Sequence, residues 1–354
     1  MVVCSEHLFY PAIIITQSCP SCQALYTKQN VKFIPNLSCR LALCARSSTD
    51  CWPPRAWLSK QTASVRISAR TEPMRDFLTE LLAAYWFAPP VALWRAVELR
   101  TAAEETYHRP LLDLGCGDGL IAGVLFGADG VDVGLDPWRE QVQKAACSGT
   151  YRWVQHGDGR SLPYADGVFA TVFSNSVLEH IPDVAPVVRE VGRVLQSPDP
   201  AGGQPGGRFI FTVPSDVFRR LLYFYQAWLA TGNRARANGY AAEVDARLSH
   251  YHYHTPQEWA DLLAEGGMVL EKSRYYIPEP VEHLWDRMNV RFGIGRRSLW
   301  GLLASPRLRG LRYQRLLARW LTARLSRAWR PYYEMEVPPG QVGGGLLVVG
   351  RKVR

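Results

Sequence analysis

The sequence lacks any apolar run of the roughly 20 residues that a membrane-spanning helix needs. Its longest candidate, Leu81 to Trp94, is short and is interrupted by Pro89 and Pro90. With 354 residues, 47% of them hydrophobic and 21% charged, the chain is long enough for one large domain with insertions or for two ordinary domains. We therefore expect a folded protein that is soluble or attached to the surface of a membrane.

Cysteine is almost absent from the main body of the chain. Six cysteines precede residue 52, and only Cys116 and Cys147 follow it. Disulfides are therefore not expected to build the main body, which is typical of a protein from a reducing compartment.

Residues 1–73 lack sustained helical or strand periodicity and contain only three acidic residues. We interpret this segment as a disordered leader outside the fold. Three explanations remain open: an organellar transit peptide, translated sequence upstream of a start at Met74, or a small zinc module that uses a Cys-x2-Cys and a Cys-x4-Cys pair. The expected location is cytoplasmic, or the chloroplast or mitochondrion if the leader is a transit peptide.

Acidic residues and lysine are missing from Arg287 to Arg330, a segment that holds twelve arginines. Once these twelve charges are taken from the formal net charge of +9, the rest of the chain carries −3. A single Arg-rich segment indicates one surface with one function, whereas nonspecific binding to polyanions would call for basic residues throughout.

From Pro110 onward, short apolar segments with strand character alternate with helical stretches. This alternation predicts an α/β fold: a Rossmann-like, doubly wound, mostly parallel sheet with helices on both faces. The expected strands are Leu111–Leu114, Val131–Leu135, Tyr151–Gln155, Phe169–Ser174, Arg208–Val213, Met268–Ile277 and Leu346–Val349.

Helical segments precede and interrupt this pattern. The first interruption combines an aromatic, helix-like segment, Phe218–Leu229, with a polar linker, Thr231–Asn238. The predicted organisation is a leader at 1–73, cap helices at 74–105, and a cofactor-binding domain at 106–354 with insertions at 215–250 and 281–340.

A glycine-rich turn, Gly115-Cys116-Gly117-Asp118-Gly119, follows the first expected strand and precedes a helical stretch. Glycines at such a turn let backbone N–H groups approach a ligand closely, because a side chain there would clash. The third glycine falls one residue earlier than in the dinucleotide pattern G-x-G-x-x-G. This spacing disfavours a pyrophosphate-bearing ligand.

Acidic residues mark the ends of the first two expected strands. Asp113 lies where a phosphate-bearing cofactor would place negative charge, so we expect a ligand with positive or neutral groups, such as a sulfonium with an amino-acid tail. Asp136 ends the second strand, 17 residues past Gly119, where a carboxylate can accept both ribose hydroxyls. The alternative for Asp136 is a cap on the helix that starts near Pro137.

These features, with the segments that follow them, resemble the class I S-adenosylmethionine-dependent methyltransferases, particularly the type 11 group of small-molecule enzymes. The resemblance implies S-adenosyl-L-methionine as cofactor, an antiparallel last strand, and methyl transfer to an O or C atom of a small acceptor. The segments that carry it are Leu111–Gly119, Gln155–Tyr164, Phe173–Ile181, Val188–Leu195 and Pro205–Phe209.

By the same resemblance, Asp158 would meet the adenine amino group, and the segment from Phe173 would line the methyl-transfer site. No metal site is expected. The implied cofactor-binding residues are Asp113, Gly115, Cys116, Gly117, Gly119, Asp136, Asp158, Gly159 and Asn175.

Methyl transfer from a sulfonium is an in-line displacement, so alignment and desolvation can supply most of the acceleration without an obligatory catalytic residue. If the acceptor is a hydroxyl or an activated carbon, histidine is the natural general base. The candidates are His180, His252 and His254. The last two belong to the run HYHYH at 250–254, whose alternating histidines would share one side of an extended chain. Substrate contact by His252 or His254, capping and packing are the alternative roles, and alternating histidines on one side could also form a metal site.

The aromatic insertion suggests a hydrophobic or planar acceptor, and the Arg-rich segment has the pattern of an amphipathic helix. Such a helix would hold the enzyme at an anionic membrane near a lipid-soluble acceptor, or would form a lid with solvated arginines. The residues are Leu317, Trp320, Leu321 and Arg324 on one face, and Arg315, Arg319 and Arg330 on another.

A binding protein is the rival class. Arginine interleaved with tryptophan and tyrosine is compatible with RNA stacking and phosphate contact, so an RNA methyltransferase or a noncatalytic cofactor-binding or RNA-binding protein is the alternative. No separate RNA-binding module is recognisable, so nucleic acid is not the expected partner. Nothing in the sequence indicates an oligomeric state.

Overall fold

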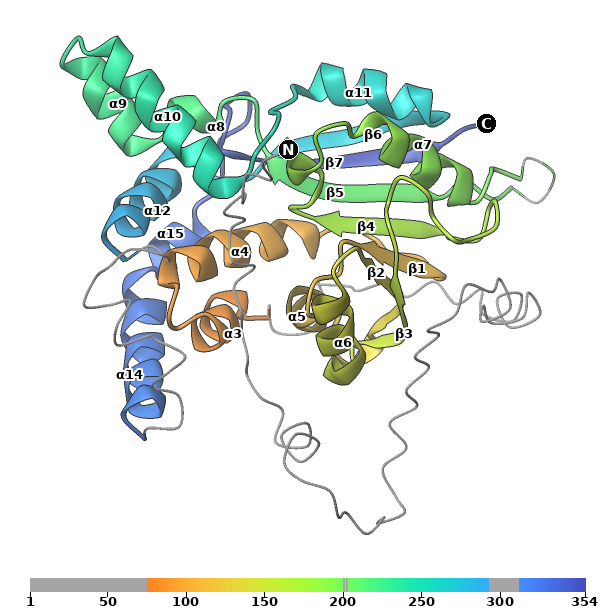
Figure 1. The fold of residues 1–354 in the computed structure, drawn as a ribbon, viewed down its shortest axis with the longest axis horizontal. Helices are drawn as coiled ribbons and strands as arrows, with labels where there is room; N and C mark the ends of the chain where they lie inside the picture. The colour runs from red at the N-terminus through yellow and green to blue at the C-terminus, as the bar shows by residue number, and fades with distance from the viewer. Residues whose placement is uncertain (1–74, 200, 202, 293–311) are drawn as a thin grey trace, which may run out of the picture.

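The computed structural model describes residues 75–199, 201, 203–292 and 312–354. They form a seven-stranded sheet in the order β3-β2-β1-β4-β5-β7-β6, with helices on both faces (Figure 1). β7 is antiparallel to both of its neighbours, whereas the other adjacent pairs are parallel. The expected α/β class and the antiparallel last strand are confirmed, and the predicted leader lies outside the described residues.

All seven expected strands form, with end points that differ from the prediction by up to three residues. β1, β2 and β5 are buried along their whole length because both faces of the sheet are covered. The strands are β1 (Leu111–Leu114), β2 (Val131–Asp136), β3 (Tyr151–His156), β4 (Thr171–Asn175), β5 (Arg208–Pro214), β6 (Met268–Tyr275) and β7 (Gly345–Lys352).

The helices lie in two layers. α7 and α11 cover one face of the sheet, and α3, α4 and α5 pack on the other (Figure 1). The bounds are α3 (Phe77–Ala84), α4 (Pro89–Ala102), α5 (Leu120–Phe126), α6 (Arg139–Ser148), α7 (Ala185–Val194), α8 (Phe218–Leu221), α9 (Tyr223–Ala230), α10 (Arg234–Leu248), α11 (Pro256–Glu265), α12 (Glu279–Phe292), α14 (Arg312–Ala328) and α15 (Arg330–Glu334), with the 3-10 turns η2 (Gly127–Asp129) and η3 (Leu178–His180).

The predicted cap at 74–105 consists of α3 and α4. The side chain of Asp76 accepts the N–H of Thr79 at the start of α3. Pro89 and Pro90 are the first two residues of α4, where a missing N–H costs nothing. α4 is buried along most of its length and contacts both β7 and α12, so its side chains reach the interior of the domain.

The first predicted insertion forms α8, α9 and α10. The prediction of a polar linker at 231–238 is wrong. α10 begins at Arg234, and the side chain of Asn233 accepts the N–H of Arg236 at 3.0 Å as its cap. The polar residues occupy the exposed face of this helix, while the small side chain of Ala237 is buried. Polarity alone therefore could not distinguish a linker from a solvated helix face.

The second predicted insertion forms α12, α14 and α15 before the chain returns to the sheet as β7; residues 293–311 lie outside the described part. α14 packs against α3 of the cap. Among the helices that the structure describes, none combines the length and the apolar character needed to cross a membrane.

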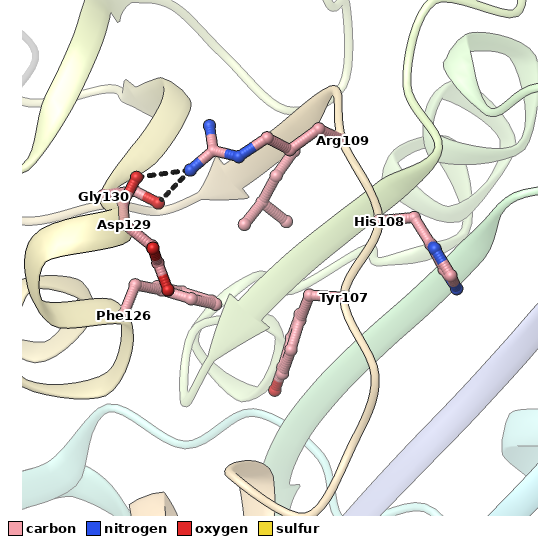
Figure 2. Close-up of a pocket in the computed structure, with 7 residues that line it drawn as sticks. Tyr107, His108, Arg109, Phe126, Asp129 and Gly130 are labelled. Atoms are coloured by element: carbon pink, nitrogen blue, oxygen red, sulfur yellow. Dashed lines mark hydrogen bonds between the residues drawn. The ribbon is translucent and has the colours of Figure 1, made fainter. Parts of the chain in front are cut away.

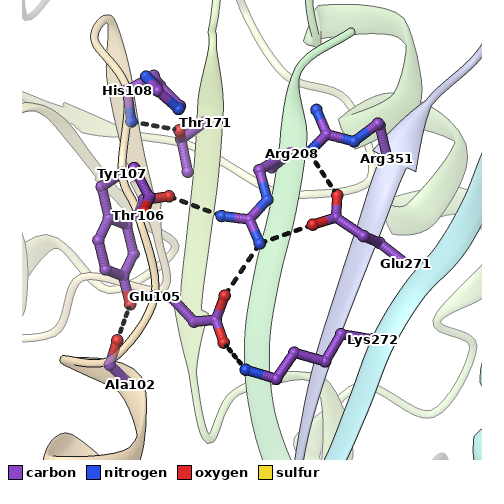
Figure 3. Close-up of polar contacts among 10 residues, drawn as sticks. All are labelled: Ala102, Glu105, Thr106, Tyr107, His108, Thr171, Arg208, Glu271, Lys272 and Arg351. Atoms are coloured by element: carbon purple, nitrogen blue, oxygen red, sulfur yellow. Dashed lines mark hydrogen bonds and ion pairs between the residues drawn. The ribbon is translucent and has the colours of Figure 1, made fainter. Parts of the chain in front are cut away.

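A buried ionic cluster ties the cap to β5, β6 and β7 (Figure 3). Arg208 of β5 donates to Glu105 and to Glu271, at 2.9 Å in each case. Lys272 also pairs with Glu105, and Arg351 pairs with Glu271 at 2.6 Å. Because Arg208 and Glu105 are buried, loss of one partner would leave a charge uncompensated in the interior.

The contact between α7 and the end of α11 makes a stability prediction. A Cβ on Gly192 would lie 2.0 Å from the carbonyl oxygen of Gly266, so Gly192→Ala should lower the free energy of unfolding by about 1–3 kcal/mol. Gly239, inside α10, is the matched control, since its Cβ would meet nothing within 4 Å and alanine favours a helix by up to about 1 kcal/mol. The urea concentration at the midpoint of unfolding should therefore fall for Gly192→Ala and rise for Gly239→Ala. Equal stability of Gly192→Ala and the unmodified protein would contradict the packing described.

Candidate functional site

The glycine-rich turn between β1 and α5 has a backbone that only glycine adopts readily. Gly115, Gly117 and Gly119 have φ angles of 80°, 53° and 83°. A Cβ on Gly115 would lie 2.5 Å from Cγ2 of Val177, whereas one on Gly117 would meet nothing within 4 Å. Gly117 therefore presents bare backbone to open space, where a ligand can approach.

Cys116 contributes to this turn through its backbone. Its N–H and that of Gly115 both donate to the carbonyl of Leu135 in β2, at 3.0 and 2.8 Å. The side chain is buried, and burial raises the pKa of the thiol well above its ordinary value. Cys116 is thus a neutral packing residue whose amide fixes the turn against the next strand.

Asp113 is buried in β1, directly before the turn. The hydroxyl of Tyr151 in β3 donates to its Oδ2 at 2.6 Å. Burial raises the pKa of Asp113 to about 7, because the single hydrogen bond from Tyr151 does not replace the lost hydration. A cationic ligand beside this carboxyl would stabilise its ionised form, which agrees with the expectation of a positively charged group.

Asp136 ends β2 beside the same turn. Its Oδ2 accepts the N–H of Gly117 at 2.9 Å, and its Oδ1 accepts the N–H of Trp138 at 2.8 Å. The second bond is the helix-entry role that the sequence left open, since Trp138 directly precedes α6. Both oxygens retain a free lone pair. The carboxylate therefore shapes the turn and could still accept hydroxyl groups from a ligand.

Asp158 and Gly159 lie on the loop after β3. Arg160 donates to both carboxylate oxygens of Asp158, at 2.6 to 3.1 Å, and these bonds lower the pKa of Asp158 below its ordinary value. The carboxylate is half exposed. A Cβ on Gly159 would lie 3.2 Å from Cδ1 of Leu114 in β1, so a small residue is needed for the loop to approach the sheet.

Asn175, the last residue of β4, is held in a polar network. Its Oδ1 accepts from Nη1 of Arg95 at 3.1 Å, and its Nδ2 donates to Oγ1 of Thr212 at 2.8 Å. Arg95 comes from α4 of the cap. The cap therefore supplies a cation to the strand end at which the sequence placed Asn175.

Glu98, one turn further along α4, is the centre of the same network. It is fully buried and accepts from Arg95 at 2.6 Å, from Ser176 at 2.7 Å and from Tyr276 at 2.9 Å. Burial alone would raise its pKa, but the charge of Arg95 and the three donors hold the pKa below its ordinary value. Ser176 has a φ of 49°, a conformation that these bonds maintain at the strand end.

Sequence reasoning missed Arg95, Glu98 and Tyr151 as site residues. The available signal was the pair Arg95 and Glu98, which stand three residues apart in a helix whose preceding residues are apolar. Charged residues at such positions are buried only when they are paired. The pattern therefore indicated an internal ion pair, although not its partner strand.

The structure separates the predicted histidines into two groups. His180, on η3 after β4, faces His250, with ring centroids 5.2 Å apart. His252 and His254 stack on each other at 4.4 Å, and His254 lies against Trp259 of α11. The stacking of His252 on His254 agrees with the expectation that alternating histidines share one side, whereas the ring of His250 contacts His180, Phe218 and Tyr253.

The small cavity in Figure 2 is not part of this site. It lies near Asp129 and Gly130, before β2, and therefore at the amino end of the parallel strands. Its volume of about 10 Å³ holds at most a single water molecule. The ligand-binding features converge instead at the carboxyl ends of β1, β2 and β4, as parallel α/β sheets favour.

Residues 112–211 match the family described as a methyltransferase domain. A demethylmenaquinone methyltransferase from Shouchella clausii is 32% identical over 130 residues, which are 32% of this chain and 50% of that protein. A ubiquinone biosynthesis O-methyltransferase from Pectobacterium atrosepticum is 32% identical over 31% of this chain and 44% of its own. The chain thus spans about half the length of these relatives.

Among solved structures, an S-adenosylmethionine-dependent methyltransferase from Mesorhizobium loti is similar. It is 18% identical to this chain, with a TM-score of 0.37 over 68% of this chain and 90% of its own.

The buried Asp113 generates a prediction about pH. Its folded-state pKa of about 7 lies above the ordinary 3.8, so its stabilising contribution is complete below that ordinary value and is lost as pH rises through about 7. Relative to Asp113→Asn, the unmodified protein should lose about 1.4 kcal/mol of unfolding free energy per pH unit over this range. Urea unfolding between pH 4 and roughly pH 9 measures this difference.

Tyr151→Phe is the companion variant. Without the hydroxyl donor, the pKa of Asp113 should rise further, so the loss of stability should extend to higher pH. A stability difference between the unmodified protein and Asp113→Asn that stays constant with pH would show that Asp113 is not desolvated in the folded state.

Proposed function

The chain contains a class I S-adenosylmethionine-dependent methyltransferase domain, and we propose that it transfers a methyl group to an O or C atom of a small hydrophobic or aromatic acceptor. The observation that carries this proposal is the convergence of the Gly115–Gly119 turn with Asp113 and Asp136 at adjacent strand ends.

The residues at these strand ends fit S-adenosylmethionine. When bound, this group supplies a methyl attached to a positively charged sulfur. The bare backbone at Gly117 leaves room for the ligand, and the free lone pairs of Asp136 can accept the ribose hydroxyls. Asp113 provides a buried carboxyl that a nearby cation would hold in its ionised form.

We propose that the acceptor binds at the end of β4, beside helices α4, α8 and α12. Phe218 of α8 packs against Trp94 of α4 and Trp285 of α12, with centroid distances of 5.7 and 5.8 Å, and stacks on Tyr253. This aromatic wall supports an apolar or planar acceptor, as do the two relatives named for quinones.

A hydroxyl acceptor would need a base, and His180 is the best placed of the three predicted histidines. His180 lies three residues after Val177, and the side chain of Val177 lies next to Gly115 of the cofactor turn. Burial lowers the pKa of His180, so the imidazole is neutral at physiological pH and Nε2 can accept a proton. His252 is less suited, because its Nε2 already contacts the carbonyl of Ile181 at 3.1 Å.

The proposal is tested by supplying labelled S-adenosylmethionine to the full chain with lipid, small-molecule and RNA fractions. We expect label in the small-molecule or lipid fraction and in demethylated quinols. Label in RNA alone would favour the alternative function, an RNA methyltransferase, and absence of label from every fraction would favour a binding protein.

Asp136→Ala should weaken S-adenosylmethionine binding by about 10-fold or more, because charge-assisted hydrogen bonds are each worth about 1.5–3 kcal/mol. Asp129→Ala is the matched control, since Asp129 is an exposed carboxylate before the opposite end of β2. Isothermal titration calorimetry should separate the two variants. Equal affinities would remove Asp136 from the binding site.

We also propose that α14 forms a surface for anionic membranes. Leu316 and Trp320 are 66% and 57% exposed, and Arg315 and Arg319 are exposed on the same helix. Apolar and cationic side chains side by side are typical of interfacial helices. Arg330, which the sequence assigned to the cationic face, is instead paired with Asp76 at 2.6 Å.

The membrane surface is tested by flotation with liposomes that contain anionic lipid. The full chain should float at low salt, and Trp320→Glu should reduce the floated fraction several-fold. Val269→Glu is the control, because Val269 is 47% exposed on β6, away from α14. Failure of the unmodified chain to float would remove this part of the proposal and leave methyl transfer untouched.

A further inference from the structure

Glu179 and His250, which have no role in the proposed reaction, form a cluster with His180, the base proposed for a hydroxyl acceptor. One carboxylate oxygen and one ring nitrogen from each histidine all lie within 4.8 Å of one another. Two segments that are distant in sequence meet here, and backbone bonds fix them. The N–H of Tyr251 donates to the carbonyl of Glu179 at 2.9 Å.

The hydrogen bonds of the two histidines determine which nitrogen is free. Nδ1 of His180 lies 3.1 Å from the carbonyl of Ser249, which can only accept, so Nδ1 carries the proton. Nδ1 of His250 lies 3.0 Å from the hydroxyl of Tyr253, which donates its own proton to Asp245. Nδ1 of His250 is therefore also the donor. In both neutral rings the Nε2 lone pair is left free.

Glu179 provides the third ligand atom. Its side chain is 3% exposed, and Oε2 has no hydrogen-bond partner among the described residues. Oε1 lies 3.8 Å from Nε2 of His180. An unpartnered carboxylate oxygen in the interior is costly unless something else satisfies it.

From this geometry we propose that Glu179, His180 and His250 bind a divalent metal ion, with Zn²⁺ as the matching ion. Two imidazole nitrogens and one carboxylate form a known three-ligand zinc set that leaves one position open. Ligand atoms at about 2.0–2.1 Å from one ion are about 3.3 Å apart, so modest side-chain rotations complete the site.

The surroundings of the cluster suit this role. Carbonyl and hydroxyl acceptors on the second nitrogen of each ring are the outer partners that orient metal-bound histidines. Burial lowers the pKa of His250 to about 2, so this ring is neutral and its lone pair is available. Arg95 is the nearby positive charge that would repel a metal ion, but its guanidinium donates to Glu98 and Asn175. His180 is partly exposed, which gives an ion a route of entry.

The proposal is tested with Zn²⁺ and full-length protein that has been treated with chelator and dialysed. Calorimetry should detect a Zn²⁺ site that weakens at least 10-fold in His250→Ala. Tyr253→Phe preserves the stacked ring but removes the acceptor for Nδ1 of His250, and it should weaken binding by about 10- to 100-fold. The readout needs neither cofactor nor acceptor, so it is independent of the proposed methyl transfer.

His254→Ala is the matched control, because His254 belongs to the same HYHYH run but stacks on His252. It should retain full affinity, and circular dichroism should confirm that every variant folds. X-ray absorption of the zinc-loaded protein should show nitrogen and oxygen ligands at about 2.0–2.1 Å, whereas cysteines of residues 1–73 would give sulfur at about 2.3 Å. Equal binding by His250→Ala, or a shell of sulfur alone, would overturn the proposal.

Discussion

The alignment of parallel strand ends is the constraint on which the rest of this structure depends. The ladders pair Asp113 of β1 with Gly134 of β2 and with Phe173 of β4, so the three strands end at one edge. The turn after β1, the acid that ends β2 and the polar network after β4 are therefore brought together by backbone hydrogen bonds. Side chains that are distant in sequence need no contact of their own to meet there.

The same edge concentrates buried carboxyls, and their surroundings make them differ. Glu98 accepts from an arginine and two hydroxyls, and its pKa is lowered. Asp113 has one donor, and its pKa is raised to about 7, while Glu179 has a free oxygen and a pKa raised to about 8. Desolvation acts on all three, so the number of partners decides which carboxyl is ionised. The two with fewer partners, Asp113 and Glu179, are the ones that a cationic group would satisfy.

The cap and the insertions connect this edge to the rest of the chain. α4 contributes Arg95 and Glu98 from its buried side, and the loop between α10 and α11 places His250 beside His180. The ionic cluster around Arg208 anchors the cap at a different part of the sheet. A domain with a widespread sheet topology thus acquires its particular site from helices added around it.

The sequence by itself determined the α/β class, the seven strands and the turn with Asp113 and Asp136, because glycine spacing and apolar periodicity are local signals. It misassigned 231–238, since a solvated helix face and a linker have the same polarity. Only the tertiary structure brought Arg95 to Asn175 and His250 to His180, because those pairs join segments that are far apart in the chain. Their meeting depends on how helices pack over the sheet, which no local pattern encodes.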